Sequence, residues 1–249
     1  MIVPNVLRRV RLQALMARQL VNWRKAWATY STGAPMPPLR FRNGLVLHHG
    51  ERDSAGALFF EIFANGCYRR GLPVALSGDV VDVGANIGAF TLDAATRYPS
   101  AIVHAYEPDP QTCQVLRRNI EANGLSSRVR IWHEAVAGES GTLTLWRGDG
   151  SVLASVHLRG VARGNSCDVP AVTLQTVVAR TCGRVGVLKL DCEGAEADIL
   201  EAAGPALDAV DCIVAEYHCA LVPDVIPRIL RVLEPPLTSP SPTGSGADP

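Results

Sequence analysis

Residues 79–92 read DVVDVGANIGAFTL, and this stretch decides the fold. Its β-branched start predicts a buried strand, and the residues after Gly88 predict a helix, so that a glycine-containing turn joins the two. The small residues Gly84, Ala85 and Gly88 would let a ligand approach the backbone closely. Asp82 places a negative charge at the end of the strand, which disfavours a pyrophosphate and favours a cationic or hydroxyl-bearing ligand.

The glycine spacing separates two classes of cofactor. Dinucleotide-binding turns carry the pattern G-x-G-x-x-G. Here Gly84 and Gly88 have three residues between them, and an acid lies two residues before the first glycine. A nicotinamide-dependent oxidoreductase is therefore a minor alternative interpretation.

The composition is typical of a globular α/β protein. The chain has 249 residues, of which 47% are hydrophobic, so one domain with a sizeable core is the simplest prediction. No apolar run approaches the roughly 20 residues of a membrane span, and the N-terminus shows no signal-peptide pattern. The seven cysteines form no CxxC pair, which favours reduced thiols and a cytoplasmic location.

A net charge of zero conceals an asymmetry along the chain. Residues 1–50 contain eight Lys or Arg and no acid, which leaves 16 of the 24 basic residues against all 24 acidic ones in the remainder. We expect the basic segment to dock on its own acidic body or on a second copy, as in a homodimer. The acidic body, without a basic stripe and interleaved aromatic residues, argues against a nucleic-acid partner.

Three regions are expected along the chain. Residues 1–38 form a basic helical arm and linker, with one long helix over 5–30. Residues 39–233 form the α/β domain. Residues 234–249, rich in Pro and Ser, form a disordered tail.

The domain alternates strands and helices, which predicts a Rossmann-like, doubly wound, mainly parallel sheet with helices on both faces. The expected strands cover 41–49 (with a turn at Asn43-Gly44), 79–83, 101–106, 129–132, 142–146, 168–172, 185–190 and 212–215. The expected helices cover 57–68, 89–97, 110–123, 173–181, 195–203 and 224–233. The stretch 147–168 has no clear period and is expected to be a long loop or a lid.

Polar side chains follow several of the expected strands. Ligands in such sheets bind beyond the carboxyl ends of the strands. Glu107 follows the second core strand, 25 residues after Asp82, close to the spacing at which an acid binds ribose hydroxyls. Asp191 and His218 follow the fourth and fifth core strands. In this topology the loop after the third core strand flanks the adenine, so Glu134 and Ala135 are expected contacts.

Five motifs then occur in order along the chain: VVDVGANIGAFTL (80–92), AYEPDP (105–110), VTLQTV (172–177), LKLDCEGAEADILEAA (188–203) and VAEYH (214–218). Together they resemble the FkbM family of S-adenosylmethionine (SAM)-dependent methyltransferases over roughly residues 55–220, and the LKLDCEGAE block is the most specific. The resemblance implies a class I methyltransferase sheet with strand order 3-2-1-4-5. It also implies SAM as cofactor, S-adenosylhomocysteine (SAH) as product, and a hydroxyl of a small metabolite, sugar or glycolipid as acceptor.

The resemblance also implies where the cofactor binds. Glu107 would bind the ribose. The residues expected at the methionine end are Asp82, Gly84, Asn86 and Gly88.

Methyl transfer to a hydroxyl requires a base that removes its proton. His218 has a suitable intrinsic pKa, and Asp191 could be the base, orient the histidine or hold a metal. Glu193 and Glu196 belong to the family's acidic block, although the helix dipole also explains acids at a helix start. We expect Asp191, His218 and Glu193 to be catalytic without a metal ion; a divalent ion held by these three residues is the alternative.

The end of the sequence departs from the family pattern. Such domains normally finish with a β-hairpin, whereas this chain turns into a Pro- and Ser-rich tail after residue 233. The strand at 212–215 would then be an exposed edge unless the N-terminal segment covers it. A catalytically silent SAM-binding or assembly protein is therefore a third interpretation.

Overall fold

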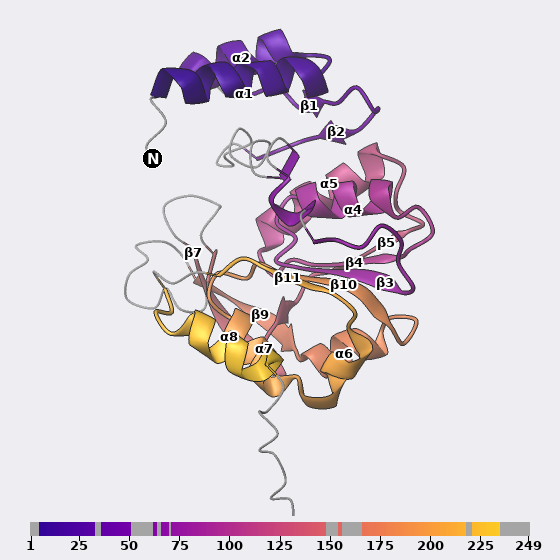
Figure 1. Ribbon diagram of the computed structural model, residues 1–249. Helices are drawn as coiled ribbons and strands as arrows, with labels where there is room; N and C mark the ends of the chain where they lie inside the picture. The colour runs from indigo at the N-terminus through magenta and orange to yellow at the C-terminus, as the bar shows by residue number, and fades with distance from the viewer. Residues whose placement is uncertain are drawn as a thin grey trace, which may run out of the picture.

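The computed structural model describes most of the chain. The described residues are 5–32, 36–50, 62–63, 66–69, 71–147, 154–155, 166–217 and 221–234. They form a central parallel sheet with helices on both faces, a second sheet and an N-terminal pair of helices (Figure 1). In this part of the chain no helix is long and apolar enough to cross a membrane.

Five parallel strands form the central sheet, in the order β11-β10-β3-β4-β5. Their bounds are Asp79–Val83 (β3), Val103–Tyr106 (β4), Val129–Trp132 (β5), Val185–Leu190 (β10) and Ile213–Ala215 (β11). Every residue of β3, β4 and β10 is buried, because both faces of the sheet are covered. The doubly wound fold and its 3-2-1-4-5 order of core strands are confirmed.

Helices cover the two faces of this sheet (Figure 1). One face carries Ala89–Arg97 (α4) and Pro110–Ala122 (α5), and the other carries Leu174–Ala179 (α6), Glu196–Ala202 (α7), the 3₁₀ turn Gly204–Ala209 (η4) and Val225–Leu233 (α8). Neighbouring residues of β3 enter different cores: Val80 clusters with Phe90 and Leu116, whereas Val81 clusters with Leu200. This division follows from the alternation of side chains along a strand.

A second, smaller sheet follows the third core strand. Its strands are Ala135–Val136 (β6), Gly141–Arg147 (β7), Ala154–Ser155 (β8) and Ser166–Val172 (β9), in the order β6-β9-β7-β8. β7 and β9 pair antiparallel, so the strands expected at 142–146 and 168–172 are confirmed. The described part of the expected loop 147–168 contains β8 and the start of β9, and the rest lies outside the described residues.

The N-terminal arm consists of two helices, so the prediction of one helix over 5–30 is wrong. The helices are Asn5–Gln19 (α1) and Trp23–Thr32 (α2). Between them, Leu20 pairs with Phe41 in an isolated β-bridge, and the Val21 amide donates to the Arg40 carbonyl at 2.7 Å. A continuous helix would need these backbone groups for itself.

A short hairpin joins the arm to the domain. It consists of Leu39–Arg40 (β1) and Val46–Leu47 (β2), so the strand expected at 41–49 is only partly formed, around the expected turn at Asn43-Gly44. The Asn119 side chain on α5 exchanges two hydrogen bonds with the His48 backbone and donates a third to the Ile87 carbonyl at 2.7 Å. The hairpin is thereby fixed to the turn after β3.

The helices of the arm lie on the far side of this hairpin from the sheet (Figure 1). Within one chain they therefore do not cover the edge of β11, and no strand follows β11 among the described residues up to 234. Most of the helix expected over 57–68 lies outside the described residues; its end belongs to a 3₁₀ turn, Cys67–Arg69 (η2). The expected tail, beyond residue 234, is also outside them.

Candidate active site

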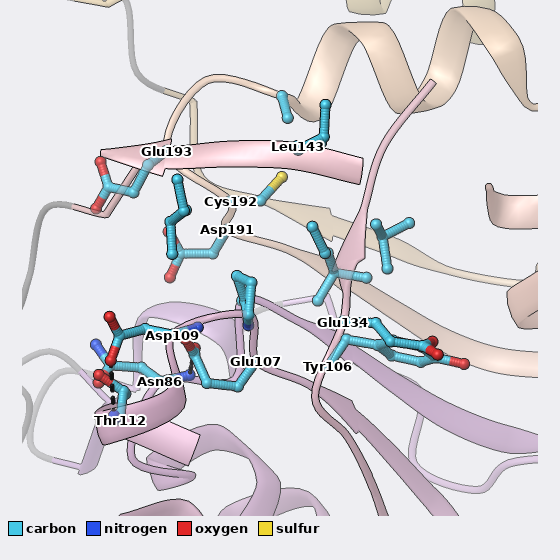
Figure 2. A pocket seen from close by; sticks show the side chains of 17 residues that line it. Asn86, Tyr106, Glu107, Asp109, Thr112, Glu134, Leu143, Asp191, Cys192 and Glu193 are labelled. Atoms are coloured by element: carbon cyan, nitrogen blue, oxygen red, sulfur yellow. Dashed lines mark hydrogen bonds between the residues drawn. The ribbon is translucent and has the colours of Figure 1, made fainter. Parts of the chain in front are cut away.

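A pocket opens at the carboxyl ends of β3, β4 and β10 (Figure 2). Its empty volume is about 770 Å³ when the open solvent at its mouth is included. The lining residues are Val83, Gly84, Asn86, Tyr106, Glu107, Pro108, Asp109, Thr112, Glu134, Ala135, Val136, Leu143, Leu145, Asp191, Cys192, Glu193 and Ala195. Seven residues predicted from the sequence are among them: Gly84, Asn86, Glu107, Glu134, Ala135, Asp191 and Glu193.

The glycines of the turn after β3 make room for the protein's own atoms. Gly84 has φ +72°, and a Cβ there would lie 1.8 Å from the Asp191 carbonyl oxygen. Gly88 has φ +88°, and a Cβ there would lie 2.5 Å from Leu116 Cδ1. Gly88 is not in the pocket wall, so its role in the structure is to pack the turn against α5.

Glu107 is held at the pocket by two backbone donors. Its Oε2 accepts a hydrogen bond from the Asn86 amide and its Oε1 one from the Asp109 amide, both at 2.8 Å. Burial raises the pKa of Glu107 to about 7, although these two donors pull it down. A carboxylate so poorly solvated is well suited to receive hydroxyl donors from a ligand.

Asp82 lies beneath the pocket and is not part of its wall. Its side chain is fully buried, with Oδ1 3.1 Å from Lys189 Nζ and Oδ2 accepting from the Thr91 hydroxyl at 2.5 Å. Lys189 also donates to the Gly84 carbonyl at 2.8 Å. Burial works to lower the pKa of Lys189, but Asp82 and then Asp191 more than reverse this, so the pKa is raised and the ammonium stays charged.

Asp191 stands in the pocket wall at the end of β10. Its Oδ2 lies 3.4 Å from Lys189 Nζ and accepts a hydrogen bond from the Tyr68 hydroxyl at 2.9 Å. The same hydroxyl contacts Glu216 Oε2, just after β11, at 2.8 Å. Figure 2 shows Asp191 across the cavity from Glu107. Glu107 and Asp191 thus face the pocket from opposite sides.

The wall around Glu134 combines charge with aromatic rings. Arg180 forms a bidentate hydrogen-bonded ion pair with Glu134. The Arg180 guanidinium also lies 4.0 Å from the centre of the Trp132 ring. The Tyr106 ring, which lines the pocket, stacks on Trp132 with centroids 5.9 Å apart. An aromatic wall beside fixed polar groups suits a flat heterocyclic ring.

The acidic block after β10 divides into a pocket residue and a structural residue. Glu193 lines the pocket and has φ +55°, an uncommon conformation for a residue other than glycine. Glu196 is buried, and its Oε1 accepts hydrogen bonds from the amides of Cys192 and Gly194, so it holds the turn at the start of α7.

His218 lies outside the described residues. Within those residues, no group of three or more His, Cys, Asp or Glu is arranged to hold a metal ion.

The sequence predictions missed three residues that organise the site. Lys189 is a lone charge inside an apolar strand, and that unusual placement is a signal for a buried ion pair. Tyr68 gives no comparable signal, because 123 residues separate it from Asp191. Arg180 reaches Glu134 across 46 residues and likewise has no local pattern.

The fold and the pocket define the class of the protein: a doubly wound α/β protein with a pocket at the carboxyl ends of its strands, where ligands bind in such sheets. The Methyltransferase FkbM domain matches residues 82–233. The 31-O-demethyl-FK506 methyltransferase FkbM of Streptomyces tacrolimicus is 31% identical over 212 residues, covering 72% of this chain and 81% of that protein. The chain belongs to the FkbM family of methyltransferases, a membership that implies the use of SAM.

Two further proteins are similar to this chain. The hexuronic acid methyltransferase AglP of Haloferax volcanii is 26% identical over 151 residues, covering 60% of this chain and 59% of that protein. The crystal structure of the methyltransferase FkbM from Methylobacillus flagellatus KT matches with a TM-score of 0.48 and 14% identity. That match covers 92% of this chain and 54% of the other, so the chain spans about half of that protein's length.

Proposed function

We propose that the protein transfers the methyl group of SAM to a hydroxyl group of a small metabolite, sugar or glycolipid. The observation that carries this proposal is the charge of the pocket. Its wall contains the carboxyl groups of Glu107, Asp109, Glu134, Asp191 and Glu193, and none of the described lining residues is Lys or Arg. Two of the five are paired with cations outside the wall, Glu134 with Arg180 and Asp191 with Lys189, so among the described residues the acids of the wall outnumber the cations beside it. SAM carries a sulfonium and an ammonium group, which such a wall attracts, whereas it repels the pyrophosphate of a nicotinamide dinucleotide.

In this proposal each predicted cofactor residue has a physical role. SAM supplies an electrophilic methyl group on its sulfonium. Glu107 accepts hydrogen bonds from the ribose hydroxyls. Glu134 and Ala135 flank the adenine beside Tyr106. Gly84 and Asn86 face the methionine end, which Asp82 and Gly88 support from beneath the wall.

The acceptor binds on the side of Asp191. Asp191 removes the proton of the attacking hydroxyl, which a base near the acceptor must do as the new bond forms. Glu193 is the second carboxylate of this side and orients the acceptor. His218 remains a proposed base in the part of the chain beyond the described residues.

The names of two relatives support an oxygen acceptor. One is named for 31-O-demethyl-FK506 and the other for hexuronic acid, and both molecules carry hydroxyl groups.

We also propose the three regions expected from the sequence, with 39–233 as the methyltransferase domain and a homodimer through the basic arm. Sedimentation velocity at low and high salt tests the homodimer.

The test is turnover with methyl-¹³C-labelled SAM and a panel of hydroxylated acceptors that includes 31-O-demethyl-FK506 and free hexuronic acids. We expect SAH and a product whose labelled carbon has the chemical shift of a methyl ether. Asp191→Asn should lower kcat roughly 10²–10⁴-fold. The control is Asp168→Asn, a change at an exposed acid on β9. A labelled methyl on nitrogen or carbon would contradict O-methylation. SAM binding without turnover on any acceptor would favour a silent binding protein.

A further inference from the structure

The Tyr68 hydroxyl lies between two carboxylates that come from different strands. It is 2.9 Å from Asp191 Oδ2, after β10, and 2.8 Å from Glu216 Oε2, after β11. The ring is fixed by an edge-on contact with Phe90 and by Lys189, whose Nζ is 5.6 Å from the ring centre. Burial, followed by the charges of Asp191 and Glu216, strongly raises the pKa of Tyr68, so the phenol keeps its proton.

The two contacts constrain which of the three groups carry protons. A phenol has one proton, so at any moment Tyr68 donates to only one of the two carboxylates. The other contact is satisfied only when that carboxylate carries a proton and donates it to the phenol oxygen. Both short contacts are therefore hydrogen bonds at the same time only when the cluster has taken up one additional proton.

The cluster also has an inner and an outer end. Asp191 lines the pocket, whereas Tyr68 and Glu216 are not part of its wall. The Lys189 ammonium contacts Asp191, and no ion pair in the described part of the chain involves Glu216. Asp191 therefore faces the pocket with Lys189 beside it, and Glu216 lies at the other end of the cluster.

We propose that Tyr68 and Glu216 form a proton relay for Asp191, an inference that rests on the proposed methyl transfer. The acceptor oxygen forms its bond to the methyl carbon as the carbon–sulfur bond breaks, and its proton moves to Asp191. Asp191 passes that proton to the Tyr68 oxygen while Tyr68 gives its own proton to Glu216. Glu216, which is partly exposed, releases it to solvent. Tyr68 and Glu216 are thus positioning residues that act through Asp191.

The first test needs no turnover. Among the described residues, the charged groups in contact with the relay or with Lys189 include Lys189, Asp82 and the two carboxylates themselves. With carboxyl-¹³C-labelled Asp and Glu, the resonances of Asp191 and Glu216 should titrate in shared steps, as coupled sites do. In Tyr68→Phe, which keeps the ring, this coupling should fall sharply. Independent titration in the wild type, or equal coupling in Tyr68→Phe, would overturn the relay whether or not the protein methylates anything.

The second test is kinetic. Tyr68→Phe and Glu216→Gln should each lower kcat about tenfold or more, because proton removal by a positioned base is worth roughly 10²–10⁴-fold. The Kd for SAM should not change, and the solvent isotope effect on kcat should change. The matched control is Tyr98→Phe, which should keep wild-type kcat. It removes a tyrosine hydroxyl that lies away from the site and donates a hydrogen bond to the Pro73 carbonyl. Wild-type kcat and isotope effect in Tyr68→Phe would refute the relay while leaving the proposed methyl transfer intact.

Discussion

Glu107 shows how a single residue can prepare a site for a ligand. The fold removes its carboxylate from water and compensates with two backbone amides, which leaves its pKa at about 7. Hydroxyl donors of a bound ligand stabilise the ionised form and therefore lower this pKa. Ligand binding and proton loss at Glu107 are thus coupled.

We predict that SAM binding releases a proton near pH 6 and none near pH 9. At pH 6, below the pKa of about 7, Glu107 is mostly protonated before binding and ionised afterwards, so affinity rises with pH through this range. Calorimetric titrations in two buffers of different ionisation enthalpy measure the released proton. Equal heats in both buffers at pH 6 would show that Glu107 does not receive the ligand's hydroxyl groups.

Lys189 is the other residue on which the site depends. It is buried between Asp82 and Asp191, and replacing it removes an ion-pair contact from each of the two acids. We predict that Lys189→Met lowers the free energy of unfolding by roughly 3–5 kcal/mol, measured by urea denaturation. Arg184→Met, at an exposed ion pair with Asp211, is the control and should have little effect. Equal stability of the two variants would contradict the assignment of Lys189 as the central cation.

At the scale of elements, the turn after β3 and the end of β10 are built against each other. The backbone of Gly84 fits only because no Cβ projects toward the Asp191 carbonyl. The residue that shapes the turn proposed to hold the cofactor therefore also fixes the loop that carries the proposed base.

We predict that Gly84→Ala both destabilises the protein and abolishes SAM binding, because the Cβ must displace the loop after β10. The control is Gly183→Ala, where φ is +92° but no atom lies within 4 Å of the added Cβ. Backbone strain should lower the free energy of unfolding of that variant by only about 1–2 kcal/mol, and its SAM affinity should not change. Urea denaturation and calorimetric titration measure the two effects. A Gly84→Ala protein that binds SAM normally would show that the two loops move independently.

The elements that sequence reasoning predicted correctly are those with local causes. β3 and β10 are mainly apolar runs, and α5 is preceded by Asp109, whose side chain accepts hydrogen bonds from the amides of Gln111 and Thr112. The break between α1 and α2 could not be predicted, because its cause is hydrogen bonding of residues 20–22 to the hairpin. Glu107 and Asp191 were found from their places after strands, whereas Tyr68 reaches Asp191 only through the tertiary fold.

At the scale of the whole molecule, the arm shares a core with the domain. Leu12, Met16 and Leu20 are buried in the same cluster as Leu116 of α5. We therefore expect the arm and the domain to unfold together.

We predict that Leu20→Ala lowers the free energy of unfolding by roughly 2–5 kcal/mol, in a single cooperative transition. Leu20 is completely buried, whereas Val21 beside it is 62% exposed, so Val21→Ala is the control and should change stability by less than about 0.5 kcal/mol. Urea denaturation followed by fluorescence and by circular dichroism checks the result. Two separate transitions, with only the first affected, would mean that the arm folds independently.

The acidic pocket leads to one decisive measurement, which is calorimetric titration of the wild type and Glu107→Ala with SAM, SAH and NAD⁺. We predict that SAM and SAH bind the wild type, that NAD⁺ does not, and that Glu107→Ala binds SAM at least about tenfold more weakly, a loss of about 1.4 kcal/mol. Binding of NAD⁺ in preference to SAM, or no binding of SAM by the folded wild type, would contradict the account.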